Sequence, residues 1–352
     1  MSEELDASAL RSVLSQGAKV RVLDVRSPEE YAAGHVTGAE NVPLDKLDGL
    51  PLGVDDDIIV YCQRGPRALQ AQGLLQGRGK RVRVFLPGYE AWHPLADGMR
   101  YARQETLPEI GAAGQARLAQ AHVAVVGAGG LGSPALLYLA GAGVGTLTII
   151  DADVVDETNL HRQVLHTTHD IGRSKVDSGL EHLRALNPLV QVHPQRVRLV
   201  EANAQDLLAG VTLVVDGSDN LSTRYAVCAA SVRLGIAVVH ASVHRFLGQL
   251  TSFVPDGSPL GAPGPCYACL FPRRPGPADA PNCAEVGVLG AVPGVLGSMQ
   301  AALALKLLLG IGDALVGRML HVDLMQMTFR SFETPRDPAC TVCGAGARLA
   351  AT

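Results

Sequence analysis

Residues 123–132, VAVVGAGGLG, decide the fold of most of this chain. The Val-rich run predicts a buried strand, and the glycines after it predict a tight turn that opens a helix. Such a turn leaves backbone N–H groups free at a helix N-terminus, where a phosphate can approach the main chain. The sequence therefore predicts a nucleotide site formed by Gly127, Gly129, Gly130 and Gly132.

The 28 residues from Val123 to Ile150 carry no charge. A stretch of this length could cross a bilayer of about 30 Å. Seven glycines and Pro134 divide them into a strand, a turn, a helix and a second strand. The uncharged stretch from Val286 to Leu305 is interrupted in the same way by Pro293 and four glycines. We expect both to be buried segments, and no contact with a membrane.

The surrounding sequence alternates strand-length and helix-length segments. This alternation predicts an α/β fold with a Rossmann-like, mostly parallel, doubly wound sheet that helices cover on both faces. The strand candidates are 123–126, 147–150, 191–193, 212–216 and 236–240.

A smaller α/β domain comes first, because residues 20–98 alternate short apolar runs with polar helical stretches. The polar stretch at 100–118 separates the two parts, and we place the boundary near residue 99. The predicted domains are 1–98 and 99–344, followed by a tail at 345–352.

Composition excludes several classes of protein. A chain of 352 residues with 47% hydrophobic and 18% charged residues can build ordinary cores, for about two domains. A net charge of −4 provides no basic field, so we expect no nucleic acid partner. Seven cysteines, an odd number, do not suit a secreted disulfide framework. The first six residues carry three acids and no base, unlike a signal peptide, so we expect a cytoplasmic protein.

Charged and amide side chains follow the glycine turn. Asp151 ends the next predicted strand, the usual place for a carboxylate that binds ribose hydroxyls, which suits NAD as well as ATP. Two amides and two cations come next and suit the charge of a triphosphate: Asn159, Gln163, Arg162 and Lys175. Asp216 and Asp219 end a later strand, where a carboxylate can hold Mg²⁺ against phosphates. Each residue alone has an ordinary structural explanation, and the combination favours ATP.

Residues 100–344 resemble the MoeB/ThiF adenylyltransferases, relatives of the ubiquitin-activating enzymes. The matching features, in order, are RYARQ, GAGGLG, the segment from Asp151 to Gln163, Lys175, DGSDN and two CxxC pairs. The resemblance implies that ATP adenylates the C-terminal glycine of a small ubiquitin-fold sulfur carrier protein ending in Gly-Gly. It is closest to the molybdopterin-synthase branch, and leaves carriers of thiamine synthesis or tRNA thiolation open.

The resemblance also implies a role for each matching residue. Asp151 would bind ribose, Arg162 and Lys175 the phosphates, with help from Asn159 and Gln163, and Asp219 would hold Mg²⁺. Arg103 of RYARQ would reach the triphosphate bound by the other subunit of a homodimer.

Two CxxC pairs lie 70 residues apart. Four thiolates without an open position make a closed tetrahedral zinc site, which is structural. A redox CxxC would predict one pair. We therefore predict Zn²⁺ bound by Cys266, Cys269, Cys340 and Cys343.

Cys62 follows the strand-like IIVY and begins the loop CQRGPR, which leads into a helix. Backbone N–H groups at a helix N-terminus, with Arg64 and Arg67 nearby, would stabilise a nucleophilic thiolate. A buried Cys at a strand end is the alternative.

Residues 20–98 resemble a rhodanese sulfurtransferase domain, including LDVRSPEEYAAGHVTGAENVPL and Trp92. The resemblance implies that Cys62 carries a persulfide taken from a persulfide or thiosulfate donor. One departure is Pro87-Gly88-Tyr89, where the family usually has a segment like Gly-Gly-Trp.

The sequence contains further cysteines and histidines outside these motifs. Cys283 stands where the adenylyltransferase family carries a Cys that can take over the acyl group or a sulfur, and an inert loop Cys is the alternative. Cys228 is expected in the core. We expect local hydrogen bonds, not a metal, at His240 and His244, and assign no role to His161, His166 and His169.

Two other classes of function remain open from the sequence. An NAD-dependent oxidoreductase is disfavoured by Arg162, Lys175 and Asp219, and native mass spectrometry of the bound cofactor would separate it. A non-catalytic module that binds ubiquitin-fold proteins is disfavoured by Asp219 and Cys62, and pyrophosphate release would decide it.

Overall fold

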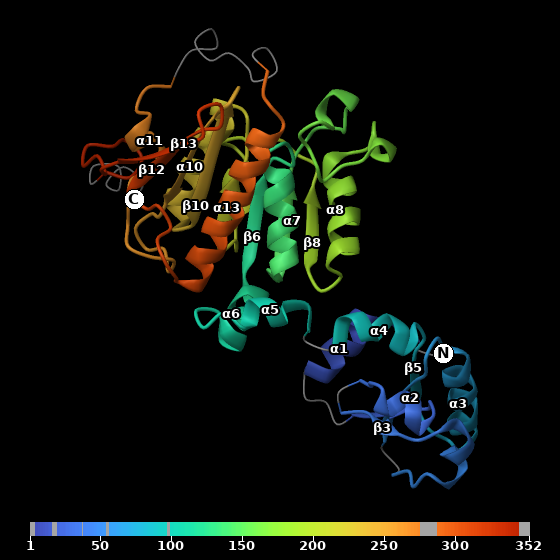
Figure 1. The fold of residues 1–352 in the computed structure, drawn as a ribbon. Coiled ribbons are helices and arrows are strands. Elements are labelled where there is room, and N and C mark those ends of the chain that lie inside the picture. The colour runs from blue at the N-terminus through green and yellow to red at the C-terminus, as the bar shows by residue number, and fades with distance from the viewer. Residues whose placement is uncertain are drawn as a thin grey trace. The chain divides into compact units, whose positions relative to one another are not determined.

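The computed structural model describes residues 4–15, 20–36, 38–53, 56–96, 99–274 and 287–344 (Figure 1). They form two compact units that divide between Arg103 and Gln104, and each unit has its own sheet. Cys283 and the tail at 345–352 lie outside the described residues.

The first unit contains a five-stranded parallel sheet of order β1-β5-β4-β2-β3. The short apolar runs of the sequence form its central strands. The strands are β1 Glu4–Leu5, β2 Val20–Asp24, β3 Glu40–Asn41, β4 Asp57–Tyr61 and β5 Val82–Phe85.

Helices cover both faces of this sheet. Ala68 and Leu75 of α3 pack on one face, whereas Leu10 of α1 and Trp92 of α4 pack on the other. The sequence sets the start of α2, where Ser27 forms a capping box with Glu30. The helical segments are α1 Ala7–Ser15, α2 Pro28–Ala32, η1 Leu44–Gly49, α3 Pro66–Gly77, α4 Gly88–Ala96, η2 Met99–Tyr101 and α5 Ala102–Glu105, of which α5 crosses the boundary between the units.

The second unit contains an eight-stranded sheet of order β13-β12-β11-β10-β9-β6-β7-β8. Strands β8, β7, β6, β9 and β10 are parallel, as predicted, and β11 to β13 add an antiparallel part that was not predicted. The strands are β6 His122–Val126, β7 Thr146–Ile150, β8 Gln191–Gln195, β9 Leu213–Asp216, β10 Ala237–His244, β11 Leu247–Phe253, β12 Arg318–Asp323 and β13 Thr328–Glu333.

Figure 1 shows α13, α7 and α8 side by side over one face of this sheet. Helices α9 and α10 and the two CxxC segments pack on the other face, which confirms the predicted double winding. The helical segments are α6 Gly111–Gln120, α7 Gly132–Ala142, η3 Glu157–Asn159, η4 Thr168–Asp170, α8 Lys175–Leu186, α9 Ala204–Leu208, α10 Leu221–Leu234, α11 Tyr267–Leu270 and α13 Ala291–Leu309.

The two uncharged stretches form parts of this unit. Residues 123–150 are β6, the glycine turn, α7 and β7. Helix α13 is long and apolar enough to cross a membrane, and 61% of its most apolar window is buried inside the structure. A core helix of a soluble protein has the same properties, and we assign α13 to the core.

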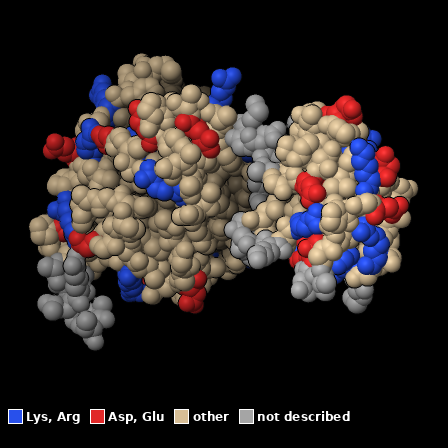
Figure 2. Space-filling view, turned by 90° about the horizontal axis from the view of Figure 1, so that it is seen from below, with Lys and Arg blue, Asp and Glu red and all other residues tan. Residues whose placement is uncertain are grey.

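Basic and acidic side chains are interspersed over the visible face in Figure 2. In the first unit, Arg21 forms ion pairs with Glu40 and Asp56, and Arg83 forms one with Asp57. Ion pairs that stay accessible to solvent, such as Arg21–Glu40, contribute little stability individually.

Gly132 makes the turn between β6 and α7 possible. A Cβ at this position would lie 1.8 Å from the carbonyl oxygen of Gly127, which itself has a positive φ of 91°. We therefore expect Gly132→Ala to lower the free energy of unfolding by about 3 kcal/mol or more, since a backbone atom must move.

The matched control is Gly141→Ala in the same helix, where a Cβ meets no atom within 4 Å. This variant should be neutral or up to about 1 kcal/mol more stable, because Ala favours helix. Urea unfolding followed by circular dichroism compares the two. Equal stabilities would contradict the packing role of Gly132.

Candidate active site and metal centre

A cleft of about 1900 Å³ opens at the carboxyl ends of β6, β7 and β9. Ligands of open α/β sheets bind at this edge. The cleft collects most of the predicted nucleotide residues, although they come from distant segments. The predicted residues that line it are Gly127, Gly129, Gly130, Asp151, Asn159, Arg162, Gln163, Lys175 and Asp219.

The glycine loop is held from its side by Asp151. One carboxylate oxygen of Asp151 accepts from the N–H of Ala128 at 2.8 Å, and the other accepts from the N–H of Asp153 at 2.8 Å. The same carboxylate lines the cleft, where each oxygen keeps a lone pair for a ribose hydroxyl. Gly132 lies outside the lining, and the structure gives it a packing role instead of a contact with the nucleotide.

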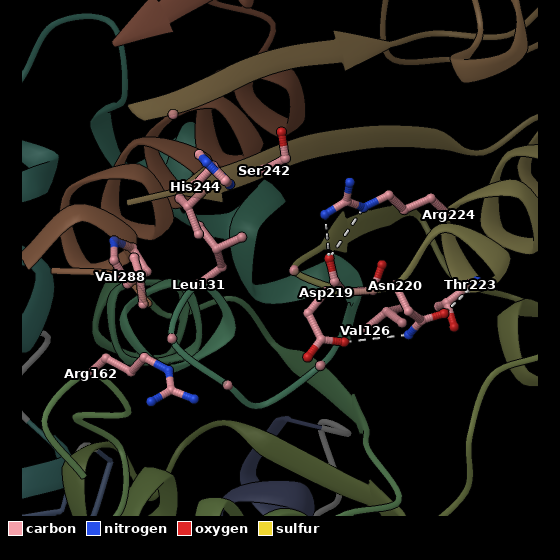
Figure 3. Close-up of a pocket in the computed structure, with 18 of the residues that line it drawn as sticks. Val126, Leu131, Arg162, Asp219, Asn220, Thr223, Arg224, Ser242, His244 and Val288 are labelled. Atoms are coloured by element: carbon pink, nitrogen blue, oxygen red, sulfur yellow. Dashed lines mark hydrogen bonds between the residues drawn. The ribbon is translucent and has the colours of Figure 1, made fainter. Parts of the chain in front are cut away.

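Arg162 and Asp219 both project into the cleft (Figure 3). Asn159 orients the guanidinium, because its Oδ1 accepts from Nη2 of Arg162 at 2.8 Å. The neighbouring Gln163 is 4% exposed, and its Oε1 has no hydrogen-bond partner among the described residues. A buried acceptor without a partner is costly, so the lining suits a ligand that brings hydroxyl or amino donors, as a nucleotide does.

Lys175 supplies a second cation at the start of α8. It is 5% exposed, and its Nζ lies 3.1 Å from the carboxylate of Asp153. A buried ammonium group that is paired with one carboxylate keeps further N–H donors for a phosphate. The positive end of the α8 dipole adds to this attraction.

The structure separates the two aspartates that the sequence placed together. Asp216 is buried and accepts from Nδ1 of His240 at 2.8 Å and from Oγ of Ser218 at 2.6 Å. Burial opposes its ionisation, but the His240 hydrogen bond and the charge of Arg224 hold the pKa of Asp216 below its ordinary value. Asp219 is exposed in the cleft and is therefore the carboxylate that can reach a metal.

Sequence reasoning missed Arg224, which lines the cleft beside Asp219 (Figure 3). Its Nε and Nη2 donate to the carbonyl oxygen of Ser218 at 3.3 and 3.0 Å, which braces the loop that carries Asp219. Its position five residues after Asp219, in the first turn of α10, was the available signal.

The cleft continues over the antiparallel part of the sheet. Ser242, His244 and Gln249 line it from β10 and β11, and His321 and Arg330 line it from β12 and β13. The predicted local hydrogen bonding of His240 is confirmed by its contact with Asp216. Within the described residues, the only cluster of potential metal ligands is the one formed by four cysteines.

That cluster brings both CxxC pairs together. The four Sγ atoms lie within 4.8 Å of one another, with distances of 3.6 Å between Cys266 and Cys340 and 3.4 Å between Cys269 and Cys343. Tetrahedral Zn–S bonds of about 2.3 Å would separate the sulfur atoms by about 3.8 Å, so the residues fit Zn²⁺. Cys228 is buried in α10, as predicted.

Cys62 lies at the end of β4, is 1% exposed, and accepts from the N–H of Gly65 at 3.1 Å. The predicted arginines surround the loop, but each has a carboxylate partner. Arg67 pairs with Glu30 through two bonds of 2.7 Å, and Arg64 pairs with Glu90.

The unusual Pro-Gly-Tyr segment packs directly behind this loop. A Cβ at Gly88, which has a φ of 71°, would lie 2.5 Å from the carbonyl oxygen of Gln63. The N–H of Tyr89 donates to the carbonyl oxygen of Cys62 at 2.7 Å. The departure from the usual sequence therefore supports the Cys62 loop.

Arg103 is exposed on α5, at the end of the first unit.

These features define a nucleotide-binding α/β domain preceded by a separate domain with a cysteine loop. Residues 101–342 match the ThiF family and residues 6–94 match the rhodanese-like domain. The chain belongs to the ThiF family, which confirms the predicted resemblance and fold class.

Several proteins of known name are similar in sequence to this chain. The SAMP-activating enzyme E1 of Haloferax volcanii is 47% identical over 247 residues, covering 70% of this chain and 89% of the relative. The sulfur carrier protein adenylyltransferase of Thermus thermophilus is 49% identical over 245 residues, covering 70% and 90%. The adenylyltransferase and sulfurtransferase MOCS3 of Mus musculus is 49% identical over 247 residues, but these span only 52% of its length.

A crystal structure of E. coli MccB with MccA-N7isoASN has the same fold, with a TM-score of 0.60, 22% identity and coverage of 70% of this chain and 74% of that chain. The names of the relatives confirm the predicted class of enzyme, an adenylyltransferase with a sulfurtransferase domain.

The four-cysteine cluster predicts that purified protein contains about one Zn²⁺ per chain. Structural zinc contributes on the order of 10–16 kcal/mol of binding energy in isolated peptides, so Cys266→Ser should lower stability sharply and lose the metal. Cys62→Ser, in the other unit, is the matched control and should keep both the stability and the zinc of the wild-type protein. Metal analysis that finds no zinc in protein prepared without chelators would refute the assignment.

The Arg67–Glu30 pair predicts an acid-sensitive first unit. The hydrogen bonds from Arg67 lower the pKa of Glu30 to about 2, against a smaller opposing effect of burial. A depressed pKa stabilises the fold above the unfolded pKa of about 4.3, and this stabilisation is lost as the pH falls towards 2. Fluorescence of Trp92, the single tryptophan, reports unfolding of this unit. Glu30→Gln should weaken the acid dependence, and an unchanged dependence would count against the pair.

Proposed function

We propose that this chain uses ATP to adenylate the C-terminal glycine of a small ubiquitin-fold sulfur carrier protein ending in Gly-Gly, and then transfers sulfur to it. One observation carries the proposal. A single cleft brings together the glycine loop, two cations and an exposed carboxylate, and then continues over an antiparallel sheet. The first part suits a nucleoside triphosphate, and the second part suits an extended peptide.

Each side chain has a role that follows from its position. Asp151 binds the ribose hydroxyls, and the N–H groups of the glycine loop approach the phosphates. Arg162, oriented by Asn159, and the buried Lys175 neutralise phosphate charge. Oε1 of Gln163 accepts a hydrogen bond from the nucleotide, because this atom otherwise has no partner in the described part of the chain.

The reaction asks little covalent chemistry of the protein. A carboxylate oxygen of the carrier attacks the α-phosphorus of ATP, the bond from that phosphorus to the bridging oxygen breaks, and pyrophosphate leaves with the electron pair. Positioning the two reactants and neutralising charge in the transition state supply most of the rate enhancement. The cleft positions the two reactants, and Arg162 and Lys175 neutralise the charge.

Two metal ions have separate roles. Asp219 would hold Mg²⁺, which supplies positive charge against the phosphates when bound. The four cysteines would hold Zn²⁺ as a structural ion, because all four positions are filled by thiolates. Arg224 keeps the Asp219 loop in place through the Ser218 carbonyl group.

The carrier tail would follow the antiparallel part of the cleft. Polar side chains of β10 and β11, among them Ser242 and Gln249, can bond to the peptide backbone of the tail. The name of the Thermus thermophilus relative, sulfur carrier protein adenylyltransferase, supports a partner of this kind.

Cys62 would carry the sulfur as a persulfide received from a persulfide or thiosulfate donor. Attack of the terminal sulfur on the acyl adenylate expels AMP and joins the carrier to that sulfur. The thiolate of a second cysteine, a role that we assign to Cys283 outside the described residues, then attacks Sγ of Cys62. The bond between the two sulfur atoms breaks, the carrier leaves as the thiocarboxylate with the electron pair, and the disulfide that remains between the two cysteines is reduced by an external dithiol before the next cycle.

We further propose a cytoplasmic homodimer in which Arg103 reaches the triphosphate bound by the other subunit. The pathway that fits the resemblance most closely is of the molybdenum cofactor type, with thiamine synthesis and tRNA thiolation as alternatives. A pull-down with the Cys62→Ser protein that captures a small partner ending in Gly-Gly would identify the carrier.

Carrier-dependent exchange between ATP and pyrophosphate tests the first half of the proposal. Asp219→Ala and Lys175→Ala should nearly abolish it, because each removes a charge that faces the phosphates. Removing one oxyanion donor elsewhere costs about 2.7–4 kcal/mol, and these charged contacts should cost at least as much. Asp177→Ala, an exposed carboxylate on α8 outside the cleft, is the control and should keep full exchange. Unchanged exchange in both site variants would refute the assignment.

The two thiols test the second half. Adenylation needs no sulfur, so Cys62→Ser should leave exchange intact while abolishing sulfur transfer from thiosulfate to cyanide and thiocarboxylate formation on the carrier. Cys283→Ser should also spare exchange, and should slow thiocarboxylate formation. Full thiocarboxylate formation by Cys62→Ser from a persulfide donor would show that sulfur enters elsewhere.

A further inference from the structure

His166 lies behind the cleft and does not line it, yet it contacts three elements that do. The side chain is 5% exposed, and both ring nitrogens have partners. Nε2 lies 3.0 Å from the carbonyl oxygen of Ala128 in the glycine loop. Nδ1 lies 2.9 Å from Oγ of Ser178, which is fully buried in α8.

The chemistry of these partners fixes the tautomer. A carbonyl oxygen can only accept, so Nε2 of His166 carries the proton and donates it to Ala128. In the neutral ring Nδ1 then accepts from the hydroxyl of Ser178. Burial, the largest cause, lowers the pKa of His166, which agrees with a neutral ring.

The hydrogen bond to Ala128 completes a clamp on the glycine loop. The N–H of Ala128 donates to Asp151 at 2.8 Å, and its carbonyl oxygen accepts from His166 at 3.0 Å. Two consecutive peptide units are therefore fixed from opposite ends of one residue. The N–H of Gly129 belongs to the second of these peptide units, so the clamp sets its direction.

His166 also joins the two cationic segments to that loop. Its backbone N–H donates to the carbonyl oxygen of Gln163 at 3.1 Å, in the turn that follows Arg162. Ser178 lies one helical turn after Lys175 in α8. The buried ring of His166 thus connects the glycine loop to the Lys175 helix, and its backbone N–H connects both to the Arg162 segment.

We infer that His166 is a positioning residue for the nucleotide, which sets the distances between the glycine loop, Arg162 and Lys175 without touching ATP. The inference rests on the proposed function and deepens it. It predicts that loss of the Ala128 contact weakens the use of ATP and leaves the use of the carrier nearly unchanged.

Three substitutions in the full-length protein separate the two hydrogen bonds. In His166→Gln the side-chain amide nitrogen takes the position of Nε2, so the hydrogen bond to the carbonyl oxygen of Ala128 is kept. His166→Asn is shorter, so that it keeps only a polar group near Ser178. Ser178→Ala removes the second partner and leaves the donor to Ala128 in place.

We expect His166→Asn to raise the KM for ATP and the Kd for ATP at least tenfold, with the KM for the carrier within twofold of wild type. His166→Gln and Ser178→Ala should stay within about threefold for ATP. Sulfur transfer from thiosulfate to cyanide, which uses the other unit, should be unchanged in all three. If His166→Asn is not recovered folded, His166→Met, which keeps the buried volume and loses both hydrogen bonds, takes its place in the comparison.

An unchanged Kd for ATP in His166→Asn, or equal losses in the Gln and Asn variants, would overturn the inference, since the second result indicates a purely structural role. Direct titration with ATP keeps this test separate from the proposed reaction. If the wild-type protein binds ATP but shows no carrier-dependent exchange, the proposed function fails while the comparison of the variants still decides the role of His166.

Discussion

The contact between Gly132 and the carbonyl oxygen of Gly127 is the constraint on which the second unit depends. Because no side chain fits there, the chain can leave β6 and enter α7 within a few residues, and the N-terminus of the helix faces the edge of the sheet. That direction brings the free N–H groups, the end of β7 and the end of β9 to one cleft. The nucleotide site is thus a consequence of one close approach between backbone atoms.

Three cations of the two candidate sites are paired with carboxylates. Lys175 pairs with Asp153, Arg67 with Glu30 and Arg64 with Glu90. Pairing keeps a long side chain in one rotamer before a substrate arrives, and so reduces the conformational entropy lost on binding. An anionic substrate must compete with the carboxylate, which favours ligands that make several contacts at once.

The sequence predicted the parallel half of the second sheet because buried central strands are short apolar runs between helices. Strand β13 of the antiparallel half was missed since every one of its residues is exposed and its sequence, TFRSFE, shows no apolar face. The same limit applied within the site. Asp216 and Asp219 both stand at the end of one predicted strand, and the sequence does not distinguish their roles. Only the position of His240 in the neighbouring strand shows that Asp216 is the one engaged in a buried hydrogen bond. A long-range contact of this kind, with the carbonyl oxygen of Ala128, also hid the role of His166.

The four-cysteine cluster has a topological consequence. Cys269 and Cys340 are separated by 70 residues, and α13, β12 and β13 all belong to that interval. A metal that bridges the two pairs closes this interval into a ring, as a cross-link would. In the chain-entropy treatment of cross-links, a ring of this size lowers the free energy of the native state relative to the unfolded chain by about 4 kcal/mol. The exposed edge strand β13 can therefore fray without releasing the end of the chain from the sheet.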